Sequence, residues 1–185
     1  DVIDYSGLEP DGLFLEGTGA MVLDHIDRVA YAVRSNRTNP VALERFCTHF
    51  NYEPMVFDAV DDNRNPVYHT NVLMCIATDF VMICLDMIPD STRRLEIEER
   101  FTRSGRQIIA LSIKQIKNFA GNALELQSNK GLVLALSNVA LKALDPKQKA
   151  IIEQSTIILP LDIPTIELAG GSVRCMLAGV HLSPR

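Results

Sequence analysis

The expected fold depends on a stretch near the end of the chain, Leu168-Ala-Gly-Gly-Ser-Val-Arg-Cys175-Met-Leu. Two adjacent glycines allow the backbone to approach a ligand closely, because they carry no side chain. An arginine then precedes a single cysteine, and a cation beside a thiol favours the ionised, nucleophilic form. Taken alone, the stretch also fits a buried and inert cysteine at the start of a strand, because free cysteine is among the most buried residue types.

The spacing of Cys175 along the chain favours the functional interpretation. Glu16, His69, Asn122 and Cys175 lie at equal intervals of 53 residues, and each precedes an apolar run of strand length. Repetition at a fixed period of this size indicates a repeated supersecondary unit. In a circular array of such units, equivalent positions face a common axis. We therefore expect Glu16, His69 and Cys175 to converge in one pocket as the parts of a nucleophilic enzyme.

Each repeat has the pattern strand, strand, helix, strand. The units cover approximately residues 16–68, 69–121 and 122–174, and residues 175–182 add the first strand of a fourth unit. One domain is expected over 1–185, because no linker rich in proline, glycine or serine divides the chain. Three units and one strand cannot close a ring, so we expect N-terminal units to be missing from this chain and the gap to lie beside that last strand.

Two helices have recognisable starts. In the second unit, Pro89-Asp90-Ser91 is expected to cap a helix that runs to about Arg103 and turns Leu95, Ile97 and Phe101 inward. In the third unit, Asn138 is expected to cap a short helix.

Composition excludes several classes of protein. The chain has 185 residues, of which 47% are hydrophobic and 22% charged, as in ordinary globular domains. Its net charge of −5 argues against nucleic acid or an anionic membrane as partner, because both need a basic surface. Its cysteines and histidines show no metal-ligand spacing, so neither a metal nor a cofactor is expected. A disulfide framework is not expected at this size, which favours the reducing cytoplasm.

Three motifs occur in order along the chain: Leu15-Glu-Gly-Thr-Gly19, Tyr68-His-Thr-Asn71 and Gly170-Gly-Ser-Val-Arg-Cys-Met176. Together they resemble the guanidino-group-modifying superfamily of arginine deiminases, dimethylarginine hydrolases and amidinotransferases. The resemblance implies a pentein-type α/β propeller of ββαβ units with an axial active site, of which this chain is an incomplete C-terminal part. The chain looks most similar to the bacterial arginine-deiminase-related branch described as citrulline-utilisation hydrolases.

The resemblance also implies roles for individual residues. Cys175 matches the nucleophile, His69 the general acid/base, and Glu16 the carboxylate that binds the guanidinium group. A thiolate suits attack on a resonance-stabilised carbon, and a histidine can move protons near neutral pH. The His69 ring is therefore expected close to hydrogen-bond reach of the Cys175 sulfur. Three further residues are expected to bind the substrate: Asn71, Arg174 and Asn122.

Three positions depart from the family pattern. Asn71 and Gly19 stand where many members have an aspartate, and Gly170 stands where arginine deiminases have an arginine. These changes leave the cysteine chemistry possible, but they affect which substrate the site is expected to bind. A neutral ureido group suits Asn71 better than a cationic guanidinium does.

These features predict a cysteine-dependent hydrolase that cleaves a C–N bond of an arginine- or citrulline-like small molecule through a covalent thiol adduct. An amidinotransferase would use the same site and pass the group to an amine instead of water. A third reading is a non-catalytic propeller of the same fold, such as a ribosome anti-association factor. That protein would have no reason to keep glutamate, histidine and cysteine at equivalent repeat positions. Whether the protein forms a homo-oligomer stays open.

Overall fold

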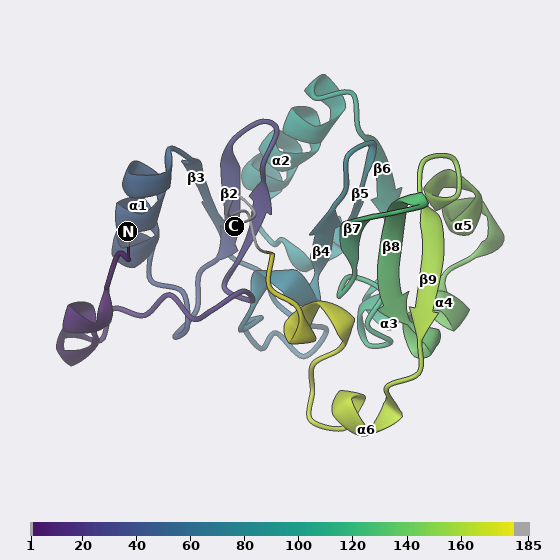
Figure 1. Ribbon diagram of the computed structural model, residues 1–185. Coiled ribbons are helices and arrows are strands. Elements are labelled where there is room, and N and C mark those ends of the chain that lie inside the picture. The colour runs from purple at the N-terminus through teal and green to yellow at the C-terminus, as the bar shows by residue number, and fades with distance from the viewer. Residues whose placement is uncertain (1, 180–185) are drawn as a thin grey trace.

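The computed structural model describes residues 2–179, which form three separate three-stranded sheets in sequence order (Figure 1). In each sheet the first two strands form an antiparallel pair, and the third strand pairs in parallel with the second. Helical segments connect the second strand to the third, because a parallel pair needs a crossover connection. The ββαβ order predicted from the repeat is therefore confirmed.

The elements have the following bounds. The first unit contains β1 (Met21–Asp24), β2 (Val29–Val33), α1 (Pro40–Phe50) and β3 (Glu53–Phe57). The second contains β4 (Met74–Ile76), β5 (Phe80–Ile83), α2 (Ser91–Arg103) and β6 (Gln107–Ala110). The third contains β7 (Leu124–Ser128), β8 (Gly131–Ser137), α4 (Asn138–Ala143), α5 (Pro146–Ile152) and β9 (Ile157–Leu161). Shorter helical turns are η1 (Ser6–Asp11), η2 (Thr70–Val72), η3 (Leu85–Met87), α3 (Ile113–Ile116), α6 (Pro164–Glu167) and η4 (Val173–Met176).

The first strands of the three units lie next to one another. Strand β4 contacts β1 on one side and β7 on the other, so these strands are innermost in the arc of sheets (Figure 1). The residues that precede these strands therefore belong to a shared axial region. Within the described residues the three sheets do not close into a ring, so the propeller is incomplete, as predicted.

Helix α2 is buried between two sheets, its own and that of the preceding unit. Ile97 and Phe101 are buried, and the Phe101 ring stacks on Tyr31 of β2 at a centroid distance of 4.9 Å. On the opposite face of β2, Ala30 and Ala32 pack against α1. Strand β2 is thus buried along its whole length, which explains its continuous apolar sequence.

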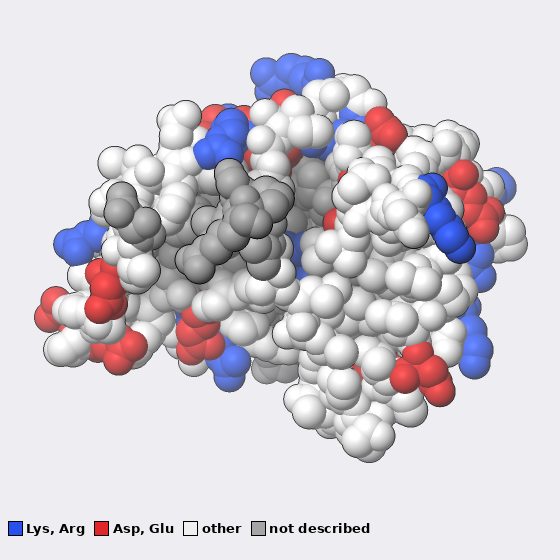
Figure 2. All heavy atoms as spheres, in the orientation of Figure 1, with Lys and Arg blue, Asp and Glu red and all other residues white. Residues whose placement is uncertain are grey.

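The outer face of the third sheet has no covering helix among the described residues. Helices α4 and α5 pack behind the sheet, whereas Ile157 and Leu159 of β9 are 51% and 43% exposed (Figure 1). Figure 2 shows a largely uncharged surface over β8 and β9. The last sheet of the arc therefore lacks the second layer that covers the other two.

The strand expected to begin at Cys175 does not form in the described part of the chain. Cys175 lies in the short 3-10 helix η4, and residues 177–179 are irregular, while residues 180–182 lie outside the described residues. Within η4 the Cys175 N–H donates to the Ser172 carbonyl and the Leu177 N–H donates to the Arg174 carbonyl, at 3.1 Å each. These two donors of the expected strand are therefore not available to a sheet.

Two details of the helices also differ from expectation. Leu95 is 55% exposed, because it lies two residues from Ile97 and so on the opposite side of α2. The N-cap of α4 is Ser137, whose hydroxyl oxygen accepts a hydrogen bond from the Ala140 N–H, and Asn138 is the first helical residue.

The contact between α2 and the preceding sheet predicts a large loss of stability in the Phe101→Ala variant. Removal of a buried phenylalanine leaves a cavity between two units and should cost about 3–5 kcal/mol of the free energy of unfolding. Urea denaturation followed by circular dichroism measures the effect.

The matched control is Leu95→Ala on the exposed side of the same helix, which should change stability by no more than about 0.5 kcal/mol. Equal losses in the two variants would contradict the burial of α2 between the sheets.

Candidate active site

The Cys175 sulfur is held between two asparagine side chains. Asn71 donates from Nδ2 to Sγ at 3.4 Å, and Asn122 donates from Nδ2 at 3.2 Å. Cys175 is exposed, whereas the other three cysteines, Cys47, Cys75 and Cys84, are buried. Cys175 is therefore the cysteine that a small molecule can reach.

The backbone of Gly171 lies directly against Cys175. A side-chain carbon at this glycine would come within 3.1 Å of Cβ and 3.3 Å of Sγ. The preceding Gly170 has a φ of 100°, a backbone conformation that favours glycine. These two properties explain why glycine stands at both positions. The positive φ also means that an arginine at position 170 would strain this turn.

Asn122 ties the cysteine segment to the rest of the fold. Its Nδ2 group also donates to the Asn71 carbonyl oxygen at 2.8 Å, while its Oδ1 accepts the Ser172 N–H at 3.1 Å. Its own carbonyl oxygen accepts the Arg174 N–H at 3.3 Å. The side chain is buried, so these bonds offset the cost of removing an amide from water. Asn122 thereby connects the second unit, the third unit and η4.

Glu16 and His69 form a second pair in the same region. The Glu16 Oε2 atom lies 3.6 Å from His69 Nε2 and 3.6 Å from Arg37 Nη1. Burial lowers the pKa of His69 below its ordinary value, and the Arg37 cation lowers the pKa further, whereas Glu16 raises it. The lowered pKa favours the neutral imidazole, the form that can accept a proton.

The His69 ring occupies the space next to Gly19. A side-chain carbon at Gly19 would lie 2.5 Å from His69 Nδ1, which no real contact permits. The Asn71 N–H also donates to the Gly19 carbonyl at 3.3 Å. The departure from the family pattern at position 19 therefore has a steric reason, because any side chain there would displace the histidine.

Tyr68 connects the two pairs. Its ring lies 5.0 Å from the His69 ring, its hydroxyl donates to the Gly170 carbonyl at 3.2 Å, and Arg37 lies over its face at 5.2 Å. Burial and the neighbouring Cys175 raise the pKa of Tyr68. The phenol therefore remains a neutral donor that braces the glycine turn. Sequence reasoning assigned no role to Tyr68 or Arg37, and the only available signal was the presence of Tyr68 in the second motif.

Arg174 points into the protein beside two sulfurs. Burial lowers the pKa of Arg174, and the neighbouring Cys75 and Cys175 raise it. Its Nε atom has no hydrogen-bond partner, and Arg174 forms no salt bridge with any residue in the described range. Its predicted contact with the substrate stays a prediction.

The six predicted site residues therefore gather into one region, as a group of three in contact, a pair in contact and one neighbour. Asn71 and Asn122 contact Cys175, Glu16 contacts His69, and Arg174 precedes the cysteine. The described residues show no hydrogen bond between the His69 ring and the Cys175 sulfur, so that predicted proximity stays a prediction.

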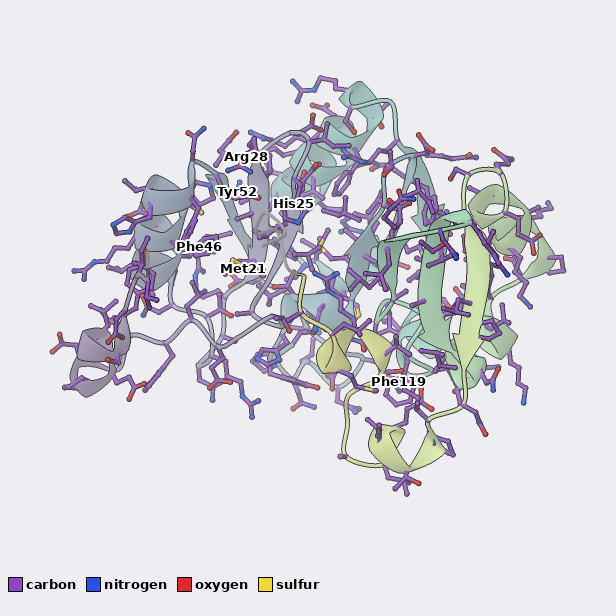
Figure 3. All side chains as sticks on the ribbon, in the orientation of Figure 1. Met21, His25, Arg28, Phe46, Tyr52 and Phe119 are labelled. Atoms are coloured by element: carbon purple, nitrogen blue, oxygen red, sulfur yellow. The ribbon has the colours of Figure 1, made fainter. Side chains whose placement is uncertain are left out.

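A cavity of about 280 Å³ borders the glycine turn. Its lining includes Tyr68, Val72, Phe119, Asn122, Gly170 and Gly171. Figure 3 labels Phe119 below the yellow C-terminal segment. A larger cavity, of about 880 Å³, lies beside α3, α4 and α5 and includes none of the predicted site residues, whereas the smaller one borders the site at Asn122.

The described residues outside this region offer no comparable constellation. His25 pairs with Tyr52 at 2.8 Å at the far end of the first sheet, next to Arg28 (Figure 3). Among the described residues no group of three or more His, Cys, Asp and Glu side chains could hold a metal ion. None of the helices described has the length and apolarity to span a membrane.

The incomplete propeller and its axial cysteine define a member of the guanidino-group-modifying superfamily of pentein proteins, as the three motifs implied. The profile of the eukaryotic N,N-dimethylarginine dimethylhydrolase family matches residues 1–182, and the chain belongs to this family. The narrower citrulline-utilisation branch is not the one that this profile describes, and it stays a prediction.

Solved structures share the fold at low sequence identity. An arginine dihydrolase from cyanobacteria, ArgZ, superposes with a TM-score of 0.72 at 17% identity over 90% of this chain and 25% of its own. AgrE, solved with ornithine and NAD+, gives 0.70 at 20% identity over 87% of this chain and 22% of its own. SxtG, an amidinotransferase from Microseira wollei, gives 0.57 at 13% identity over 85% of this chain and 42% of its own.

This chain thus spans about a quarter of the length of ArgZ and AgrE. No curated protein matches it by sequence.

The close contact at Gly19 predicts that Gly19→Ala displaces the His69 ring. Because the new methyl group would overlap Nδ1, the imidazole must leave Glu16, and activity should fall by at least about a hundredfold if His69 moves the proton. Turnover assays and an NMR titration of His69 measure the two effects.

Gly7→Ala is the control, because a side-chain carbon there would meet no atom within 4 Å. Wild-type turnover in Gly19→Ala would contradict a role for the observed position of the ring.

The charges around His69 predict opposite shifts in two variants. Arg37→Gln removes a cation that lowers the pKa of His69, so the pKa should rise. Glu16→Gln removes the anion that raises it, so the pKa should fall. Proton NMR of the imidazole C–H signals against pH measures both, with His69→Asn used to assign the signal.

Shifts of the same sign in both variants would contradict the electrostatic account.

Proposed function

We propose that this chain carries the site of a cysteine-dependent hydrolase that cleaves a C–N bond of a guanidino or ureido compound. The observation that carries the proposal is the surroundings of Cys175. An exposed sulfur that accepts two N–H groups lies in one region with a neutral histidine paired to a carboxylate. Nucleophile, proton acceptor and orienting acid are the parts that such a reaction needs.

The first half of the reaction forms a covalent adduct. The Cys175 thiolate attacks the central carbon of the guanidino or ureido group, a C–S bond forms, and the C–N bond to the leaving amine breaks. The proton that Cys175 gave up is carried by His69 to the amine as it leaves. Glu16 is placed to hold the planar N–H groups of the substrate, once its contact with Arg37 gives way.

The second half releases the product. Neutral His69 accepts a proton from water as the oxygen attacks the carbon, and the C–S bond breaks to return the sulfur as thiolate. The proton on the histidine balances the one taken by the amine. A lowered pKa of His69 supports this role as base near neutral pH.

An arginine-like substrate agrees with the comparisons. The family is described by its action on dimethylarginine, ArgZ is an arginine dihydrolase, and AgrE was solved with L-arginine. Asn71 in place of an acid favours a neutral ureido group such as that of citrulline. The four cysteines are free, which supports a reducing compartment such as the cytoplasm.

An amidinotransferase is the second candidate, favoured by the likeness to SxtG. Its adduct would be resolved by an amine rather than by water. Mass spectrometry of a reaction with arginine and glycine distinguishes the two, because a transferase forms a new guanidino compound from the glycine.

The central prediction is that purified protein releases an amine from at least one of arginine, citrulline, agmatine and dimethylarginine. Cys175→Ala should abolish turnover, because no other exposed thiol replaces the nucleophile. His69→Ala should lower turnover by about 10²- to 10⁴-fold and accumulate the thiol adduct, because hydrolysis needs the base more than attack does. Amine release and intact-protein mass spectrometry measure these effects.

Cys47→Ala is the control, because this thiol lies on the buried face of α1 and its high pKa, about 11, leaves it unreactive. Full activity in Cys175→Ala would end the covalent mechanism. Inactivity of the wild type on all four compounds would favour a binding role for the propeller.

A further inference from the structure

We propose that Asn122 and Asn71 stabilise the anionic sulfur of Cys175 during the reaction, a role beyond the substrate binding predicted for them. The inference rests on the proposed function, because it concerns the nucleophile of that reaction. It assigns to two amide side chains the part that a cation or a histidine has beside many reactive cysteines.

The orientation of the Asn122 amide follows from its hydrogen bonds. The Ser172 N–H can only donate, so the oxygen of the amide must face it, at 3.1 Å. The Asn71 carbonyl can only accept, so the NH₂ group faces that oxygen, at 2.8 Å. The second N–H of the same NH₂ group then points to the Cys175 sulfur at 3.2 Å. The sulfur is thereby given a donor that cannot turn away.

Asn71 adds a second donor from the neighbouring unit. Its Nδ2 lies 3.4 Å from the sulfur, and the residue is fully buried. Its Oδ1 atom has no partner among the described residues, so its orientation is held less firmly than that of Asn122. We therefore regard Asn122 as the principal donor and Asn71 as the supporting one.

The repeat supports this assignment for Asn122. It stands at the position that holds Glu16, His69 and Cys175 in the other units, 53 residues before the cysteine. Each unit thus places one polar side chain in the axial region. A buried amide at this position is costly unless all its groups are bonded, and here both N–H groups and the oxygen have partners.

The donors act on both halves of the reaction. A hydrogen bond to an anion is about twice as strong as one between neutral groups, so the donors favour thiolate over thiol. When the C–S bond forms, the sulfur loses its charge and the bonds weaken. When water attacks the carbon and the C–S bond breaks, the electron pair returns to the sulfur and the bonds strengthen. The two amides therefore make the sulfur a better leaving group in the hydrolytic step.

The test is the rate of alkylation of Cys175 by iodoacetamide between pH 6 and 10. Cys175 is the exposed one of the four cysteines, so the reagent reports on it selectively. Asn122→Asp keeps an oxygen for the Ser172 N–H and replaces the donor to sulfur by an acceptor. The rate at pH 7 should fall by about tenfold or more, because the sulfur loses its principal donor.

Asn118→Asp is the matched control. It makes the same change of charge four residues earlier, where the amide donates to the Lys114 carbonyl instead of a sulfur. Its alkylation should match the wild type. If Asn122→Asp fails to fold, Asn71→Ala tests the inference instead. Its alkylation rate should fall several-fold, because the sulfur loses one donor. Unchanged alkylation in a folded Asn122→Asp, or in Asn71→Ala when that variant decides, overturns the inference.

Alkylation does not require turnover, so the two ideas fail separately. Slower alkylation of the variants in a protein that hydrolyses none of the substrates would leave the donor role standing and refute the proposed function. Turnover in the wild type with unchanged alkylation in the variants would support the proposed function and refute the donor role of the two asparagines.

Discussion

The packing of helix α2 between two sheets is the constraint on which the rest of this structure depends. Helix α2 packs behind its own sheet and against the sheet of the unit before it, through the stacked rings of Phe101 and Tyr31. Because α2 is shared in this way, the first two units sit at a fixed offset, and β1, β4 and β7 lie side by side. The axial region is the consequence of that offset. The functional residues converge because the apolar layers around them are packed in register.

The site depends on two positions at which the backbone closely approaches a side chain. Gly19 leaves room for the His69 ring and Gly171 leaves room for the Cys175 side chain, so two glycines give the catalytic groups their space. The positions at which the chain departs from its superfamily are thus not losses of function by themselves. Gly19 is a steric requirement of the observed histidine, and Gly170 is a conformational requirement of the turn.

The repeat and its hairpins could be predicted from the sequence, because apolar runs and turn residues recur at a constant interval and local propensity agrees with the final fold. Helix α2 was predicted with Ile97 and Phe101 inward, but Leu95 was assigned to the wrong side of it. The strand expected at Cys175 was wrong for a different reason. The N–H groups of Cys175 and Leu177 bond within η4, and the residues just before Cys175 are held by Asn122, a distant partner that no local pattern indicates.

The sequence by itself determined the repeat, and it predicted a shared axial region, since a constant spacing places Glu16, His69, Asn122 and Cys175 at equivalent positions. It also predicted the class of chemistry, because a thiol, an imidazole and a carboxylate limit the reactions available. Only the tertiary structure determined which side chains contact one another. Arg37 lowers the pKa of His69 and two asparagines donate to the sulfur, because hydrogen bonds and charge effects depend on distances of a few ångströms between units. Periodicity along a chain carries no information at that scale.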